Sequence, residues 1–354
     1  MGTSGAAGVL VTGAGTIVAQ GIMKCLRLAN LASPSPSYRI VATDMSPQAA
    51  GLYRADLGLL VPPATSEDYV STIVKVCREE RIQAVFVGSD EELGVLARES
   101  RRVEGETGAV VVADPAALAV GSDKMETFRF LRANNLPCAD SALPDDESFV
   151  RDHGFPLVVK PREGHGSLQF HLAHDGDQLR SYAASIERAG WRPMLQEYLP
   201  EDDEEYTTGV TIDRVGRRVM SSISMRRTLK GGQTFRAFVD DFPHVRRSAE
   251  EIALRMKMRG PVNVQTRLVG DEPKVFEINP RFSASLAIRA AAGVNEPDIV
   301  FRNWVLGQEV RMEGIRKLVC LRYFNEVFVP EPTYLETARA GRVERGGSST
   351  IDYF

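Results

Sequence analysis

Side chains that carry oxygen atoms gather in one predicted β-hairpin in the second half of the chain. The segments Val262–Val269 and Lys274–Ile278 flank a Gly-Asp-Glu-Pro turn and predict two paired strands. Glu277 and Asn279 are two residues apart, so they share one face of their strand. Pairing across the hairpin can bring Gln265 opposite that face. The sequence therefore predicts a small cluster of carboxylate and amide oxygens.

This cluster has the chemistry of a site for Mg²⁺ or Mn²⁺. Mg²⁺ prefers oxygen ligands and often takes one or two protein carboxylates together with phosphate oxygens and water. Arg281 ends the motif Val-Phe-Glu-Ile-Asn-Pro-Arg and adds a cation near the same phosphates. A solvated polar face is the commoner explanation for an isolated Glu or Gln, so the cluster needs further partners.

A lysine at the end of another apolar strand is the first such partner. Lys160 ends the run Pro156–Lys160 and precedes a loop rich in small residues, Pro161–Ser167. A lysine in this position can hold nucleotide phosphates, with backbone N–H groups of the loop as further donors. The loop lacks the spacing of a Walker A motif, and taken alone it is more often an ordinary hairpin turn.

Two acidic residues in the first third of the chain are candidates for binding substrate. Glu91 and Glu92 follow the predicted strand Ala84–Gly88, at the carboxyl edge where open α/β sheets bind ligands. An acidic side chain there can hold an ammonium group. The alternative is that both residues only favour the start of the next helix through its dipole.

Basic residues around a Gly-Gly pair form a second candidate group for substrate. The set comprises Arg226, Arg227, Lys230, Arg236 and Arg289. An arginine can pair bidentately with a substrate carboxylate, although most charge clusters are solvated faces. Arg236 and Arg289 are the better candidates, because one is flanked by phenylalanines and the other by an alanine-rich run.

A glycine turn near the N-terminus suggests a different class of function. Gly13-Ala14-Gly15 follows a predicted strand, and Asp44 ends the next one, as in dinucleotide-binding proteins. The third glycine of that motif is missing, so the match is partial. A nicotinamide-dependent oxidoreductase is therefore a minor alternative.

The first third of the chain alternates short apolar runs with helical patterns. The predicted strands are Gly8–Thr12, Arg39–Asp44, Leu57–Val61, Ala84–Gly88 and Ala109–Ala113. Thr16–Asn30 and Ser66–Arg81 predict helices, the second with Ser66 as its N-cap. This alternation predicts a parallel sheet covered on both faces.

The middle of the chain has an α+β pattern. After a predicted helix at Ser122–Asn134, the further predicted strands are Leu168–Ala173, Met194–Tyr198 and Glu205–Ile212. The segment from about residue 311 is basic and rich in β-forming residues.

Composition excludes several classes of protein. The net charge of −4 argues against general electrostatic binding of nucleic acid. The chain has no apolar run long enough to span a membrane. Four scattered cysteines suit reduced thiols in the cytoplasm better than disulfides or a zinc site.

Several motifs occur in one order along the chain: SDK at Lys124, VVKP at Lys160, EGHGS, LQEYL, EEYT, NVQ and FEINPR. This succession resembles the ATP-grasp superfamily, in particular the branch that includes each half of the carbamoyl phosphate synthase large subunit and amino-acid ligases. The likeness covers about residues 8–310. The ordered set is far more specific than any single motif.

The resemblance implies a role for each matching position. Lys124 and Lys160 would bind ATP phosphates, and Arg281, with Lys160, would assist the transfer of the phosphoryl group. Gln265, Glu277 and Asn279 would hold Mg²⁺. The remaining ATP-binding positions would be Gly164, His165, Gly166 and Ser167 in a flap, Gln196, Glu197 and Tyr198 in the adenine hinge, and Glu205 at the ribose. Ser283 would border the acceptor substrate, in a stretch that is poorer in glycine than the family pattern.

The resemblance also implies a domain organisation. We expect a Rossmann-like (pre-ATP-grasp) domain at 1–114, a small ATP-grasp lobe at 115–195, a large lobe at 196–310, and a C-terminal extension at 311–354 that packs on the core. The fold class is thus α/β followed by α+β.

The implied function is that of an ATP-dependent carboxylate–amine ligase, which uses ATP and Mg²⁺ to join two small molecules. An amino acid is an expected substrate, and a homodimer is the expected assembly. Activation of bicarbonate and a non-catalytic nucleotide or amino-acid sensor are the alternatives.

Overall fold

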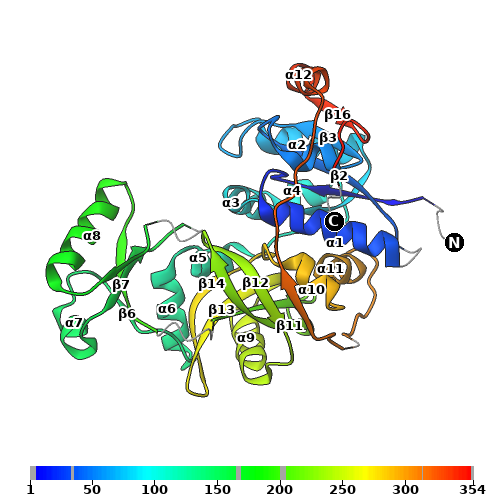
Figure 1. Ribbon diagram of the computed structural model, residues 1–354. Helices are drawn as coiled ribbons and strands as arrows, with labels where there is room; N and C mark the ends of the chain where they lie inside the picture. Colours follow the sequence, from blue (N-terminus) through cyan, green and yellow to red (C-terminus); the bar gives the residue numbers. More distant parts are fainter. Residues whose placement is uncertain (1–4, 33–35, 165–168, 200–204, 313, 352–354) are drawn as a thin grey trace.

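The computed structural model describes residues 5–32, 36–164, 169–199, 205–312 and 314–351. Within these residues the chain forms three β-sheets with helices packed around them (Figure 1). The first sheet lies at the top of the view, the small four-stranded sheet at the left, and the third sheet below.

The first sheet is built by the apolar runs of the first third of the chain. Its strand order is β16-β3-β2-β1-β4-β5, and β1 to β5 are parallel. The strands are β1 (Ala7–Val11), β2 (Tyr38–Asp44), β3 (Leu57–Leu60), β4 (Ile82–Phe86), β5 (Ala109–Val111) and β16 (Arg342–Glu344). Every residue of β1 is buried, because helices cover both faces of the sheet.

The helices of this first part are α1 (Ile17–Ala32), the 3₁₀ helix η1 (Ala50–Arg54), α2 (Tyr69–Glu79), α3 (Asp90–Arg98) and α4 (Ser100–Glu104). The predicted strands and the helix at Thr16–Asn30 are confirmed within one or two residues at most boundaries. The predicted cap at Ser66 is wrong, because α2 begins only at Tyr69 and Asp68 occupies the cap position. Ser66 instead lies in the preceding turn, where its hydroxyl accepts from Asp68 N at 3.3 Å.

The four-stranded sheet has the order β6-β9-β7-β8 and its own hydrophobic core. Its elements are β6 (Ser141–Ala142), α7 (Glu147–His153), β7 (Leu157–Pro161), β8 (His171–Ala173), α8 (Gly176–Arg188) and β9 (Pro193–Glu197). Two helices, α5 (Pro115–Ser122) and α6 (Lys124–Ala133), connect the first sheet to this lobe. β8 is shorter than the predicted strand at Leu168–Ala173.

The third sheet is antiparallel, with the order β14-β13-β10-β11-β12-β15. Its strands are β10 (Glu205–Ile212), β11 (Val219–Lys230), β12 (Gln233–Val239), β13 (Gly260–Val269), β14 (Glu272–Asn279) and β15 (Leu318–Leu321). The helix α9 (Pro243–Arg255) packs on one face, and α10 (Leu286–Ala291) and α11 (Glu296–Trp304) pack on the other. This sheet carries the predicted hairpin.

The segment after α11 joins the two large sheets. β15 pairs antiparallel with β12 at the edge of the third sheet. The chain then crosses to the first sheet, where α12 (Glu331–Ala340) precedes β16, and β16 pairs antiparallel with β3 (Figure 1). Residues from the two ends of the sequence therefore share one sheet.

Candidate active site

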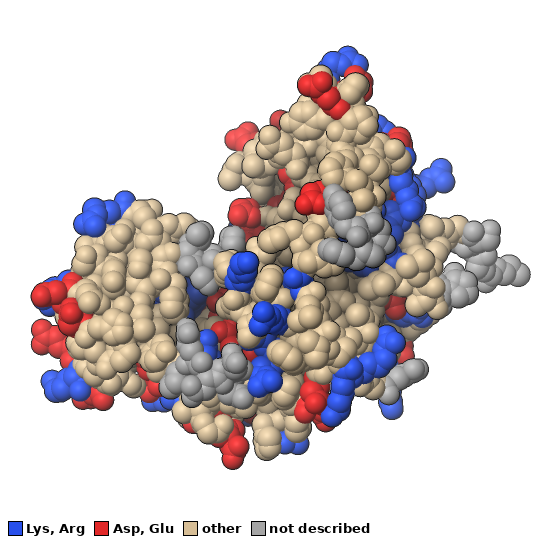
Figure 2. All heavy atoms as spheres, in the orientation of Figure 1, with Lys and Arg blue, Asp and Glu red and all other residues tan. Residues whose placement is uncertain are grey.

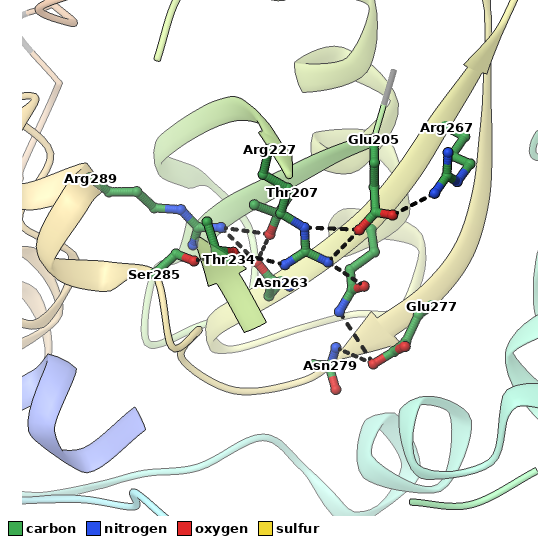
Figure 3. A network of polar contacts seen from close by, with 11 residues as sticks. Glu205, Thr207, Arg227, Thr234, Asn263, Arg267, Glu277, Asn279, Ser285 and Arg289 are labelled. Atoms are coloured by element: carbon green, nitrogen blue, oxygen red, sulfur yellow. Dashed lines mark hydrogen bonds and ion pairs between the residues drawn. The ribbon is translucent and has the colours of Figure 1, made fainter. Parts of the chain in front are cut away.

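The predicted hairpin is formed by β13 and β14, and its register brings the predicted oxygen ligands together. Gln265 is the cross-strand partner of Glu277, and Asn263 is that of Asn279. Asn279 Nδ2 donates to Glu277 Oε1 at 2.9 Å, and Gln265 Nε2 donates to the same oxygen at 3.3 Å. The expected cluster of one carboxylate and two amides is thus present (Figure 3).

The charge of Glu277 is stabilised by cations from other parts of the chain. Burial alone raises the pKa of this carboxyl group, but Lys124, the hydrogen bond from Asn279, Lys160 and Arg227 together hold the pKa below its ordinary value. Glu277 is therefore an anion at neutral pH. Figure 2 shows basic side chains gathered at the centre of the view, between the four-stranded lobe and the rest of the molecule. This arrangement suits a divalent cation next to phosphate groups.

Lys160 lies on β7 of the four-stranded sheet and points toward β14 of the third sheet. Its Nζ donates to Gln196 Oε1 at 2.8 Å and lies 5.9 Å from the centre of the Phe276 ring. Gln196 in turn donates to Ser141 Oγ at 3.0 Å. Burial, together with the nearby charge of Lys124, lowers the pKa of Lys160 to about 7. Lys160 is thus a buried amine between two lobes.

Lys124 is the first residue of α6 and lies beside the start of the predicted flap. Its Nζ donates to Gly164 O at 2.8 Å. The preceding residue, Asp123, caps the helix by accepting from Met125 N and forms an ion pair with Arg162. These contacts fix the orientation of Lys124. His165, Gly166 and Ser167 lie outside the described residues.

Glu205 begins β10 and is held by two arginines. Arg227 on β11 donates to Glu205 Oε1 from Nε at 3.0 Å and from Nη2 at 2.8 Å, and Arg267 on β13 donates to Oε2 at 2.8 Å (Figure 3). Arg227 Nη2 also donates to Gln265 Oε1 at 2.8 Å. The carboxylate of Glu205 is thus linked to Gln265 through one guanidinium group.

Arg281 lies two residues beyond Asn279 and pairs with the first domain. Its Nε and Nη2 donate to the two carboxylate oxygens of Asp90, the second at 3.1 Å. Its Nη1 donates to Phe282 O at 2.9 Å. The end of the hairpin is therefore attached to the start of α3.

Models of known families match both parts of the chain. The model described as PylC-like, N-terminal domain matches residues 9–112, and the model described as ATP-grasp in the biosynthetic pathway with Ter operon matches residues 192–323. Residues 192–323 of the chain are thus similar to an ATP-grasp domain.

The chain is also similar to curated relatives over most of its length. The chain is 24% identical to the carbamoyl phosphate synthase large chain of Vibrio cholerae, over 91% of this chain and 31% of that protein. It is 25% identical to the corresponding large chain of Streptomyces coelicolor, over 80% of this chain and 27% of that protein. The chain therefore spans less than a third of the length of these relatives.

Solved structures show the same ATP-grasp fold. A biotin carboxylase–β,γ-ATP complex from Campylobacter jejuni matches with a TM-score of 0.68 at 12% identity, over 92% of this chain and 76% of that one. N5-carboxyaminoimidazole synthetase from Staphylococcus aureus complexed with ADP matches with a TM-score of 0.68 at 16% identity, over 98% of this chain and 91% of that one. The predicted fold class is confirmed.

The residues predicted for the adenine hinge of the ATP-grasp fold lie at the end of β9. The carboxylate of Glu197 accepts from Lys274 Nζ at 2.8 and 2.9 Å and from Asp140 N at 2.8 Å. Because that side chain is occupied, the backbone of Glu197 is the part of this residue that remains for reading an adenine edge. The hinge role of Glu197 and Tyr198 stays a prediction.

The two acidic residues predicted for substrate have different surroundings. Glu91 is exposed and its carboxylate is hydrogen-bonded to Ser89. Glu92 is buried and accepts from Thr12 Oγ1. Burial raises the pKa of Glu92 to about 7. Only their neighbour Asp90 reaches the hairpin.

Arg289, a predicted substrate-binding residue, is enclosed by other residues of the chain. It is fully buried on α10, where Nη1 donates to Glu296 Oε1 at 3.0 Å and Nη2 donates to Asn263 Oδ1 at 2.6 Å. Thr207 and Asn263 lie on the face of the sheet that carries Gln265, so the buried guanidinium group of Arg289 belongs to the network drawn in Figure 3. Its predicted contact with substrate stays a prediction. The alanine-rich run around it makes α10 a buried helix.

Arg236 is absent from the cluster. On β12, Arg236 is the cross-strand partner of Thr228, and Thr234 is the partner of the next residue, Leu229. β12 therefore contains one extra residue, a bulge, between Thr234 and Arg236. The bulge places Arg236 on the face opposite Thr234, and Thr234 Oγ1 accepts from Arg227 Nη1 at 3.2 Å. Ser283, in contrast, lies in the buried loop after Arg281, where its Oγ accepts from Ser285 N at 3.2 Å.

Asp44, the acidic residue of the dinucleotide alternative, is hydrogen-bonded to two backbone N–H groups of the first domain. Asp44 Oδ2 accepts from Gly15 N at 2.7 Å, and Oδ1 accepts from Ser46 N at 2.9 Å. Asp44 thus fixes the glycine turn, in which Gly13 has a φ of 62°. The carboxylate that would bind a ribose is occupied locally.

Two residues of the site, Arg227 and Asp90, are not singled out by the sequence pattern. Both lie within candidate segments, but the pattern favours their neighbours. Strand alternation offers a signal for Arg227, because Met225 pairs with Thr207 and so places Arg227 on the same face as Glu205. No comparable local signal distinguishes Asp90 from Glu91.

The hairpin fits Mg²⁺ by the chemistry of its donors, which are one anionic carboxylate and two amides. In this structure both amides turn N–H groups toward Glu277, so holding a cation requires them to present their oxygens instead. The described residues contain no group of three or more His, Cys, Asp or Glu that could hold a metal. Phosphate oxygens and water would have to complete the coordination.

Proposed function

We propose that the chain is an ATP-dependent carboxylate–amine ligase that forms an amide bond and releases ADP and phosphate, with an amino acid as one substrate. The observation that carries this proposal is the meeting of two lysines, one from α6 and one from β7, with a carboxylate of the third sheet. Lys124 and Lys160 both lower the pKa of Glu277, which lies on the third sheet. Phosphoryl transfer needs cations and a metal-binding carboxylate placed around the phosphate groups.

The roles follow from the contacts. Lys124 and Lys160 bind phosphate oxygens of ATP, and Gln265, Glu277 and Asn279 hold Mg²⁺. When bound, Mg²⁺ neutralises charge on the phosphates. Glu205 is the proposed ribose contact, and its two arginine partners fix the orientation in which it would share an oxygen with a hydroxyl group. Arg281 is the cation for the transferring phosphoryl group.

The proposed reaction has two steps. A carboxylate oxygen of the first substrate attacks the γ-phosphorus of ATP, the bond to the bridging oxygen breaks, and ADP leaves. The amine of the second substrate then attacks the acyl carbon, the carbon–oxygen bond breaks, phosphate leaves, and the nitrogen loses a proton. The chain's own residues position these groups and balance their charge.

A second candidate reaction uses bicarbonate in place of an organic carboxylate. It is supported by the names of the relatives, which include carbamoyl phosphate synthase large chains. It is also supported by a structurally similar protein with a TM-score of 0.64, the biotin carboxylase domain of a Hydrogenobacter thermophilus 2-oxoglutarate carboxylase, whose crystal structure holds MgADP and a bicarbonate anion. Bicarbonate-dependent release of ADP without any amino acid would favour this reaction.

A cytoplasmic location is part of the proposal. It is supported by four cysteines that are all free thiols, three of them buried. Among the described residues, no helix is both long and apolar enough to cross a lipid bilayer.

The test is a screen for phosphate release with amino acids offered in pairs, in which each product is identified by mass. Glu277→Gln removes the anion but keeps the shape, and we expect turnover to fall by roughly 100-fold or more. Glu272→Gln is the matched control, because Glu272 is an exposed residue at the start of the same strand. This control variant should keep its activity.

Two outcomes would contradict the proposal. Release of AMP and pyrophosphate in place of ADP and phosphate would rule out the acyl phosphate. Turnover of Glu277→Gln close to that of the unchanged protein would rule out the metal assignment. Melting curves of both variants exclude a loss of fold as the cause.

A further inference from the structure

The hydrogen bonds of Arg281 prevent it from forming a bidentate hydrogen bond to a phosphoryl group. A guanidinium group has five N–H donors. In Arg281, Nε and Nη2 donate to Asp90, Nη2 also lies 3.4 Å from Asn279 Oδ1, and Nη1 donates to Phe282 O. One N–H of Nη1 remains, whereas a bidentate bond to a phosphoryl group needs two adjacent donors.

The restraint comes from a different domain. Asp90 is the first residue of α3, which packs on the first sheet. Arg281 follows β14, the second strand of the hairpin in the third sheet. Both side chains are largely shielded, with exposed fractions of 31% for Asp90 and 12% for Arg281. A shielded bidentate pair between carboxylate and arginine is stronger than an exposed one.

Asp90 also borders a groove of the first domain. The groove has a volume of about 740 Å³, and its walls include Asp90, Glu91 and Ser122. Ser122 precedes α6, whose first residue is Lys124, but Lys124 itself does not line the groove. A cationic group that enters the groove has the carboxylate of Asp90 within reach and competes with Arg281 for it.

We propose that Asp90 is a positioning residue that restrains Arg281, so that ATP is hydrolysed slowly until the contact between the first domain and Arg281 breaks. This inference rests on the proposed function, since it concerns the same phosphoryl transfer. It assigns to the first domain a control over ATP use, in addition to binding substrate. Such control limits the loss of ATP to water.

The experiment compares phosphate release from Mg²⁺–ATP alone by the full chain and by Asp90→Asn. The substitution removes the negative charge that holds Arg281, so we expect the rate of release to rise roughly 5- to 10-fold. Damage to the fold does not accelerate a reaction, so a gain separates positioning from a structural role. Asp90→Glu keeps the charge and should keep the low rate.

Binding gives a second measurement that needs no turnover. With Mg²⁺ and a non-hydrolysable ATP analogue, Asp90→Asn should lower the Kd several-fold, because Arg281 becomes available to the γ-phosphate. The Kd for adenosine should not change. In the double variant Asp90→Asn with Arg281→Gln, both gains should disappear.

Asp114→Asn is the matched control. Asp114 also forms a bidentate pair with an arginine of the third sheet's domain, Arg259, but neither residue belongs to the candidate site. Its phosphate release and its Kd for the analogue should equal those of the unchanged protein.

An unchanged or lower rate in folded Asp90→Asn, together with an unchanged Kd for the analogue, overturns the inference. This result is distinct from failure of the proposed function. The function fails when no pair of substrates yields ADP, phosphate and a joined product, whereas the restraint is measured with nucleotide alone.

Discussion

Lys160 shows how a single residue of this site depends on its surroundings. Its stem is enclosed by β7, β9 and Phe276, so its ammonium group has lost most of its water. Only Gln196 Oε1 accepts from it among the described residues. Burial and Lys124 lower its pKa to about 7 from 10.5, and bound phosphates would raise it again by supplying negative charge.

We predict that ATP binding weakens as pH rises above 7. Neutral Lys160 must take up a proton to hold phosphate, so the Kd of Mg²⁺–ATP should rise by up to about 10-fold per pH unit between pH 7 and 9. In Lys160→Arg the cation keeps its proton and the slope should vanish. Equilibrium dialysis across this range measures both.

The same pKa fixes the sign of a stability effect. Between pH 7 and 10 the unfolded chain keeps the proton on Lys160 and the folded chain does not, so the contribution of this group to stability rises with pH in that window. Lys317→Arg, at an exposed lysine paired with Asp240, is the control for both effects. If the Kd of Mg²⁺–ATP in the unchanged protein stayed constant between pH 7 and 9, the titration assigned to Lys160 would be contradicted.

At the scale of elements, a buried ion pair joins α10 to α11, and its arginine is hydrogen-bonded to the third sheet. The exposed fractions of the Arg289 and Glu296 side chains are 0% and 1%. Arg289 reaches Thr207 on β10 and Asn263 on β13, and its pKa is lowered by burial. Gly209 is a residue of β10 that faces the pair, and its lack of a side chain gives Arg289 and Glu296 room.

We predict that Gly209→Ala destabilises the protein by about 3 kcal/mol, because the new methyl group would overlap Arg289 and Glu296. Chemical unfolding measures the change. Gly94→Ala is the control, because the nearest atom to the added methyl group is the end of the Arg98 side chain at 3.5 Å. Equal midpoints for the two variants would show that the buried pair can move aside.

The elements also show what sequence could and could not predict. The period-two pattern of β13 and β14 was sufficient to predict their pairing and the partners Gln265 and Glu277. The bulge in β12 is not visible in the residue pattern, so the face of Arg236 could not be predicted. The burial of Arg289 depends on Glu296 in the next helix, which only the tertiary structure brings near.

At the scale of the whole molecule, two hydrophobic cores continue from the first sheet into the third, while the four-stranded lobe has a core of its own. Lys160 therefore belongs to a lobe that packs separately from the hairpin it faces. The predicted domain bounds stay a prediction. The joining of the first and third sheets by residues beyond 311 depends on contacts that a local pattern does not contain.

We predict that a chain ending at residue 330 loses stability in its first domain. It lacks α12 and β16, so Val343 leaves the core and the edge of β3 becomes exposed. The melting temperature should fall by roughly 5 °C or more. Hydrogen exchange should rise first in β3 and β2.

The control for this truncation is Arg345→Ala. It removes only the exposed ion pair with Asp56 and should change the melting temperature little. Melting of the truncated chain at the temperature of the full chain would show that β16 contributes nothing to the first sheet.

The pairing of β3 with β16 has a consequence for synthesis of the protein. Ribosomes make Gly58 long before its partner Val343, so the first sheet emerges with an edge whose backbone groups have no strand beside them. During nearly all of translation this edge can recruit a strand from another nascent chain. Once β16 has been synthesised, it pairs with β3 and covers this edge. The C-terminal segment thus prevents intermolecular strand pairing after synthesis is complete.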